Sequence, residues 1–259
     1  MPNTVQMRNE LLPNFHPFQR KQQMANDVPA NESEFVTFAL GLLHDFFDQQ
    51  GCCYRLRREV GVGRNIADVV ALCTPTAVFS LPPESLTITE SVVLSSLRLR
   101  GPTRIDLLER RCGARRGVLR NGALKRLRDS GAVTCGPGGR IALSAEWSRD
   151  YRLVAIEAKL TKWRDALKQA KEYRRYADEA YVLLPAGFAN RARRAEDEFR
   201  DAGVGLWIIA GQKLTLSITA EKARDHCWRR EFVFSRLVSE EPCSGRTHGE
   251  STQCSCDAA

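Results

Sequence analysis

Apolar residues recur along this chain with two different periods, and the change from one period to the other separates the predicted elements. Residues 1–30 show neither period, so we expect them to form a flexible arm. After Ser33, apolar positions three and four residues apart predict a helix that ends near Gly51. Residues 53–60 then alternate between apolar and polar positions, and residues 66–72 form a short apolar run. Both segments are predicted strands.

Strand and helix patterns alternate again in the second half of the chain. Four segments are predicted strands, the last of them an edge strand: 151–160, 180–185, 204–210 and 213–219. Two amphipathic segments are predicted helices: 162–176 and 189–202. We therefore expect an α/β core built from residues 31–81 and 148–238, followed by a disordered polar tail at 239–259.

The segment between the two halves of the core, residues 82–147, is mostly helical in its pattern. Its predicted elements are a helix at 89–99, a short helix after Thr103, a basic helix at 114–129 and a hairpin at 132–143. This order resembles a winged helix-turn-helix domain, which is here inserted into the core. The resemblance implies that residues 114–128 are a recognition helix in a major groove, and that the wing contacts the DNA backbone.

The basic residues of the chain are concentrated in this insertion. Between residues 98 and 128, eleven Arg and Lys side chains are opposed only by Asp106 and Glu109, which leaves a net charge of +9. The whole chain carries +8, so the remainder is nearly neutral. Such a block favours a surface that neutralises phosphates, and a solvated helical face is the alternative. The residues expected to contact nucleic acid are Arg115, Arg116, Arg120, Lys125, Arg126 and Arg140.

Three charged residues lie inside the predicted strands of the core. Glu157 and Lys159 are two positions apart, so their side chains point to the same face of their strand. Asp68 lies alone within the apolar run 66–72. Charges in such strands are costly unless they bind a metal, serve chemistry or are satisfied by neighbours. If the two strands pair, Asp68 and Glu157 can hold one divalent cation, and oxygen ligands suit Mg²⁺ or Mn²⁺.

These residues resemble the active-site pattern of the PD-(D/E)xK nuclease superfamily. The match consists of Asp68 after Ile-Ala, where Ala replaces the usual Pro, and of Glu157 and Lys159 in Glu-Ala-Lys. The turn Gly-Val-Gly-Arg-Asn before the strand of Asp68 is similar to the glycine-rich hairpin of archaeal Holliday-junction resolvases. The resemblance covers roughly residues 33–80 and 150–220, and it implies a restriction-endonuclease-like mixed sheet flanked by helices.

Three further residues match elements of relatives within that superfamily. Glu34 occupies the place of an acid on the first helix of the resolvases, where it would bind metal. The alternative for Glu34 is an acid that the helix dipole favours. Gln169 and Tyr173 lie four apart on one helical face and match the Q-x-x-x-Y element of RecB-like nucleases. They would steady the site or contact the DNA backbone, and the alternative is that they are ordinary polar residues of a half-exposed helix.

The resemblance also implies roles in phosphodiester hydrolysis. Asp68, Glu157 and the backbone carbonyl of Ala158 would bind the metal, which activates a water molecule and offsets charge on the scissile phosphate. Lys159 would orient the attacking water or stabilise the developing charge. Many members of the superfamily act as dimers, which allows a homodimer here.

Taken together, the patterns predict a magnesium-dependent DNA endonuclease whose insertion binds DNA while the core cuts it. The alternatives are a non-catalytic DNA-binding regulator with a degenerate nuclease-like core, and an enzyme that processes structured RNA. We expect no small-molecule substrate, and the isolated histidines do not support acyl transfer. No segment is apolar enough to span a membrane, the start of the chain lacks a signal-peptide pattern, and the nine cysteines lack disulfide-type spacing. We therefore expect a cytoplasmic protein.

Overall fold

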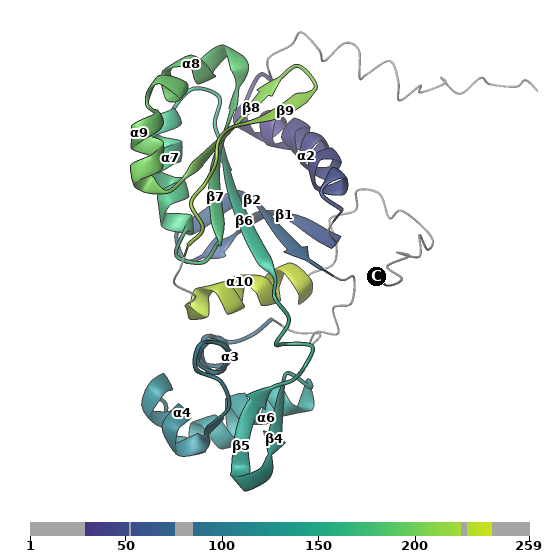
Figure 1. Ribbon diagram of the computed structural model, residues 1–259, viewed down its shortest axis with the longest axis vertical. Coiled ribbons are helices and arrows are strands. Elements are labelled where there is room, and N and C mark those ends of the chain that lie inside the picture. Colours follow the sequence, from purple (N-terminus) through teal and green to yellow (C-terminus); the bar gives the residue numbers. More distant parts are fainter. Residues whose placement is uncertain (1–28, 52, 76–84, 224–226, 240–259) are drawn as a thin grey trace, which may run out of the picture.

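A computed structural model describes residues 29–51, 53–75, 85–223 and 227–239. It confirms the α/β class, since a six-stranded mixed sheet carries helices on both faces (Figure 1). The strands are β1 (Cys53–Val62), β2 (Asn65–Thr74), β6 (Arg152–Ala158), β7 (Glu179–Pro185), β8 (Gly205–Ala210) and β9 (Lys213–Ile218). Their order in the sheet is β1-β2-β6-β7-β8-β9, in which β6, β7 and β8 are parallel and the other pairs are antiparallel. The predicted edge strand is confirmed as β9.

Each face of this sheet has its own hydrophobic core. Helix α2 (Glu32–Gln49) covers one face, where it packs on Val154 and Ile156 of β6. The other face packs against α7 (Trp163–Tyr173), α8 (Ala186–Arg194), α9 (Glu196–Ala202) and α10 (Trp228–Ser239). Because β6 is buried on both faces, its sequence is almost continuously apolar rather than alternating.

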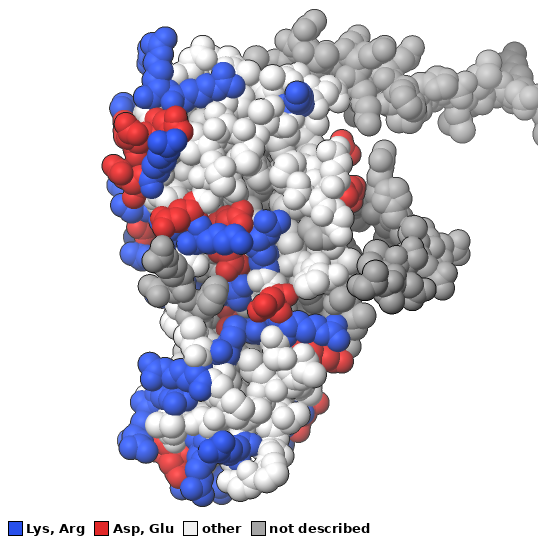
Figure 2. Space-filling model, in the orientation of Figure 1, with Lys and Arg blue, Asp and Glu red and all other residues white. Residues whose placement is uncertain are grey.

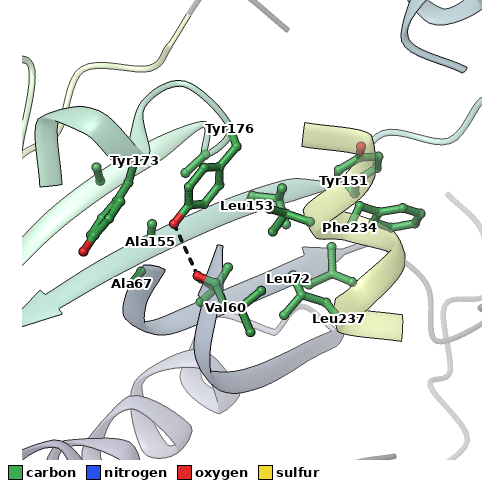
Figure 3. Close-up of a cluster of buried hydrophobic side chains, with 14 of the residues drawn as sticks. Val60, Ala67, Leu72, Tyr151, Leu153, Ala155, Tyr173, Tyr176, Phe234 and Leu237 are labelled. Carbon is green, nitrogen blue, oxygen red and sulfur yellow. Dashed lines mark hydrogen bonds between the residues drawn. The ribbon is translucent and has the colours of Figure 1, made fainter. Parts of the chain in front are cut away.

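Three helical segments differ from the expectation. The predicted basic helix 114–129 begins at Arg116 and contains a π-helical turn at Leu119–Ala123. The predicted helix 189–202 is two helices, because the backbone leaves the helical conformation at Ala195. Helix α10 was not predicted, since Arg230 and Glu231 interrupt its apolar pattern, yet both are buried. Figure 3 shows Leu237 of this helix beside the sheet residue Leu72, and the ring of Phe234 beside that of Tyr151, on which it stacks.

The insertion forms a separate lobe below the sheet in Figure 1. Its helices are α3 (Ile88–Arg100), α4 (Ile105–Cys112), α5 (Arg116–Val118) and α6 (Leu124–Asp129), with a π-helical turn at Leu119–Ala123 between the last two. A small sheet completes it, with β3 (Thr103–Arg104), β5 (Arg140–Leu143) and β4 (Val133–Gly136) in that order. The predicted hairpin is therefore present, and it gains β3 as a third strand.

Helices α3 and α10 join the two lobes through a buried ion pair. The Arg98 Nε atom lies 2.7 Å from Oε1 of Glu231, whose side chain is 1% exposed. Arg98 also donates to the carbonyl oxygen of Trp147 at 2.6 Å, in the segment that returns the chain to the core. Removing one member of such a buried pair typically costs about 3–5 kcal/mol, so this contact holds the insertion firmly against the sheet domain.

The predicted N-terminal arm and C-terminal tail fall almost entirely outside the described residues. Within the ranges that are described, no helix is both long and apolar enough to cross a bilayer.

Candidate active site

The β1–β2 hairpin brings Asp68 to the end of β6. Its turn consists of Gly63 and Arg64, and Gly63 has a φ of 65°, which glycine adopts without strain. Val69 of β2 lies opposite Ile156 of β6, so the next antiparallel pair beyond it is Asp68 and Glu157. The backbone N–H of Ala158 donates to Oδ2 of Asp68 at 2.8 Å. The two strands therefore pair, and the two acids share one face of the sheet at its end.

Both carboxyl groups lie in surroundings that oppose their charge. Glu157 is 2% exposed, whereas Asp68 is partly buried. Burial raises the pKa of Asp68, and the hydrogen bond from Ala158 offsets only part of that effect. Burial, followed by repulsion from Asp68, raises the pKa of Glu157 despite the hydrogen bond from Tyr173. Two neighbouring carboxylates with raised pKa values form a site that a cation would stabilise.

Lys159 is the nearest cation to this pair. Its Nζ atom lies 3.2 Å from Oε1 of Glu157 and 3.0 Å from Oε2 of Glu32, at the start of α2. Burial lowers the pKa of the ammonium group, but Glu32 and Glu157 outweigh it, and the pKa of Lys159 lies above its ordinary value. The three acids Glu32, Asp68 and Glu157 thus share one ammonium, which leaves the group negatively charged.

Tyr173 ties helix α7 to the same site. Its hydroxyl lies 2.6 Å from Oε2 of Glu157 and 2.8 Å from the carbonyl oxygen of Ile66. The hydroxyl has a single hydrogen, so it donates to one of these two oxygens at a time. Burial and the hydrogen bond to Glu157 raise the pKa of Tyr173 far above its usual range, so it remains a donor. Gln169 lies on the exposed side of α7, and no hydrogen bond within the described residues joins it to the acids.

The structure brings Glu32, rather than Glu34, to the site. The Glu34 carboxylate accepts from the backbone N–H of Ala30 at 3.1 Å and from Nδ2 of Asn31 at 2.9 Å. The N–H of Glu34 in turn donates to Oδ1 of Asn31, the N-cap residue of α2. Glu32 precedes Glu34 by two residues, so helical geometry directs their side chains to different sides. Sequence spacing alone does not indicate which of them reaches Lys159.

The residues present are suited to a hard divalent cation. Oδ1 of Asp68 makes no hydrogen bond within the described residues, so it is available as a ligand. Among those residues, no three or more His, Cys, Asp and Glu side chains form a complete metal-binding group. A cation held by Asp68 and Glu157 would therefore need the Ala158 carbonyl or water as further ligands, which Mg²⁺ accepts readily.

The six residues expected to bind nucleic acid are all exposed on the insertion. Two of them also have acidic partners there: Arg116 lies 3.0 Å from Asp106, and Arg126 lies 3.0 Å from Glu90. Glu90 is 1% exposed, so Arg126 neutralises a buried acid of α3 in addition to any outward role. Figure 2 shows basic side chains over this lower lobe and a second group near α8.

The chain was compared with protein families, curated proteins and solved structures. No family model, no curated protein and no solved structure matches it.

Proposed function

We propose that the protein is a metal-dependent DNA endonuclease. One observation carries the proposal: Asp68, Glu157 and Lys159 meet at the end of two paired strands, where the carboxylates have raised pKa values and the ammonium lies within 3.2 Å of Glu157. Strained acid pairs of this kind are typical of sites that bind metals or perform chemistry. The proposal includes a restriction-endonuclease-like core and a winged-helix insertion, which the strand order and the three-stranded sheet of the insertion support.

Each residue of the candidate site has a definite part in this proposal. Asp68, Glu157 and the carbonyl of Ala158 would hold the cation, which when bound lowers the pKa of its water and offsets charge on the scissile phosphate. Tyr173 orients Glu157 through its hydroxyl. Lys159 presents a positive charge beside the acids and stabilises the negative charge that develops on the phosphate oxygens.

The insertion would supply most of the affinity for DNA. All six of its candidate cations are exposed, and only Arg116 and Arg126 of these form salt bridges with acids within the described residues, as expected of side chains that neutralise phosphates. The buried Arg98–Glu231 pair would then hold the bound duplex in a fixed orientation toward the sheet end.

The test is incubation of the full chain with supercoiled, linear and branched DNA, with and without Mg²⁺. We expect cleavage that requires the metal and that disappears in Asp68→Asn and Glu157→Gln, while the affinity for DNA measured without metal stays nearly unchanged. Asn at position 68 can still accept the hydrogen bond from Ala158, so this variant removes charge without removing the contact.

Two results would contradict the proposal. Full cleavage by both variants would exclude this site as the source of activity. Tight DNA binding without cleavage of any substrate would instead support a regulator that retains the nuclease-like core as a scaffold.

A further inference from the structure

A groove of about 670 Å³ opens next to the candidate active site. It lies between the segment that follows β6 and the start of α8. Its walls consist of Thr161, Lys162, Trp163, Arg164, Asp165, Gly187, Phe188, Asn190 and Arg191. Three chain steps separate Lys159 from Lys162, so their Cα atoms are at most about 11 Å apart. That distance corresponds to about three nucleotide steps along one strand of a duplex.

The groove is positively charged. Lys162, Arg164 and Arg191 contribute three cations, and Asp165 is the acid among the lining residues. Arg164 is held in place, because it lies over the ring of Trp163 and within 3.1 Å of Oε1 of Glu198. Lys162 and Arg191 are exposed, so both are available to phosphate oxygens.

Phe188 gives this basic groove an aromatic surface. Its side chain is 43% exposed, although its neighbour in α8, Ala189, is buried in the core. Solitary exposed apolar residues are common on proteins, but Phe188 lines the groove together with three cations. Aromatic rings beside a basic track are the elements that hold single-stranded nucleic acid, because a base stacks on the ring while its phosphate contacts the cations.

Bases that are paired in a duplex cannot stack on such an aromatic surface. In a duplex each base is already stacked on its neighbours, and only an unpaired or extruded base offers a free face to a side chain. We infer that the groove binds an unpaired strand segment, with a base stacked on Phe188 and phosphates at Lys162 and Arg191. The inference rests on the proposed function and deepens it, since it assigns a substrate class in which a duplex adjoins a single-stranded extension or branch.

Affinity measurements under conditions that prevent cleavage test this inference. The affinities of the full chain for a blunt duplex and for the same duplex with a single-stranded extension are measured by fluorescence anisotropy, with a chelator present. We expect the wild-type chain to prefer the extended DNA. Phe188→Ala should weaken binding of the extended DNA by about five- to a hundredfold, the range of one base–aromatic stack, and leave the blunt duplex unaffected.

Matched variants separate stacking from general damage. Phe188→Trp should retain the preference, whereas Leu216→Ala, which removes a 45% exposed side chain on β9, should change neither affinity. For the extended DNA, the double variant Lys162→Ala/Arg191→Ala should flatten the slope of log K against log salt by about 1.4, at about 0.7 per phosphate contact on a single strand. Lys213→Ala, an exposed cation on β9, is its control.

The inference is overturned if Phe188→Ala lowers the affinities for both DNAs equally or leaves both affinities unchanged. It is also overturned if the variant loses only its affinity for a free mononucleotide. Unchanged blunt-duplex affinity of the variant shows that it is folded. Because cleavage is assayed separately with Mg²⁺, a chain that prefers extended DNA but never cuts would refute the nuclease and leave the groove assignment intact.

Discussion

The end of the six-stranded sheet and the insertion both use charge, but in opposite ways. At the sheet end, Asp68, Glu157 and Lys159 are wholly or partly buried and lie within contact distance of their partners. On the insertion, the six cations expected to bind nucleic acid are exposed and spread over several short helices and a hairpin. Buried charges interact strongly over short distances, whereas exposed ones act at longer range and are screened by salt. The buried charges at the sheet end suit chemistry, and the exposed cations of the insertion suit binding of a polyanion.

The two regions also differ in what their charges do to stability. The acids at the sheet end oppose folding, because burial and repulsion raise their pKa values. The cations Arg115, Arg120, Lys125 and Arg140 of the insertion lie in water, where each one has little effect on the free energy of unfolding. Variants of the first region should therefore change rate and stability together, whereas variants of the second should change affinity alone.

After the loss of cleavage expected in Asp68→Asn and Glu157→Gln, the largest effect is expected at Lys159. Lys159→Ala removes the ammonium that lies 3.2 Å from Glu157, and cleavage should slow by about a hundredfold or more. DNA affinity should be retained, and Lys213→Ala on β9 is a matched control that should cut normally. Single-turnover kinetics at saturating enzyme measure the difference. A normal rate in Lys159→Ala would remove this residue from the chemistry.

The next largest expected effect tests whether the cations of the insertion contact DNA phosphates. Replacement of Arg115, Arg116, Arg120 and Lys125 by Ala should flatten the slope of log K against log salt by about 2.7 to 3.6, at about 0.9 per duplex phosphate contact. The lower figure applies if Arg116 keeps its contact with Asp106 in the complex. Cleavage should fail at moderate salt and recover at low salt. An unchanged slope would mean that these cations face solvent or another protein.

A smaller effect separates the two acids at the start of α2. Glu34→Ala removes the acceptor for the Ala30 N–H and the Asn31 side chain, and should lower the free energy of unfolding by about 1 kcal/mol, with normal cleavage. Glu32→Gln should leave stability nearly unchanged but slow cleavage severalfold, because the Glu32 carboxylate helps to hold Lys159. Urea titration and a cleavage assay of both variants provide the comparison. The reverse outcome would place Glu34 at the site.

The smallest effect concerns stability and pH. Because burial raises the pKa of Asp68 in the folded state, its ionised form destabilises the fold at neutral pH. Asp68→Asn should therefore raise the midpoint of thermal unfolding at pH 7 by a few degrees at most. The gain should shrink as the pH falls through the raised folded-state pKa and vanish below the unfolded-state pKa, where Asp68 is neutral in both states. Asp150→Asn, in an exposed loop, should show no gain at any pH.

The periodicity of the sequence determined most of the architecture. Strands buried on both faces need near-continuous apolar runs, and amphipathic helices need apolar positions three or four apart, so both leave a pattern that is readable without coordinates. Asp68, Glu157 and Lys159 could be selected as candidates for the same reason, because charges inside such strands are conspicuous.

Only the tertiary structure decided what lies beside these residues. The choice of Glu32 over Glu34 depends on how α2 is placed on the sheet, and the contact of Tyr173 with Glu157 depends on how α7 packs across β6. The hydrophobic pattern of the sequence did not reveal helix α10, because its buried charged residues have partners from distant segments. Glu231, for example, pairs with Arg98. The groove beside Lys159 likewise joins residues 161–165 to 187–191. Local patterns report which face of an element is buried, whereas contacts between elements depend on how the whole chain packs, which no single segment encodes.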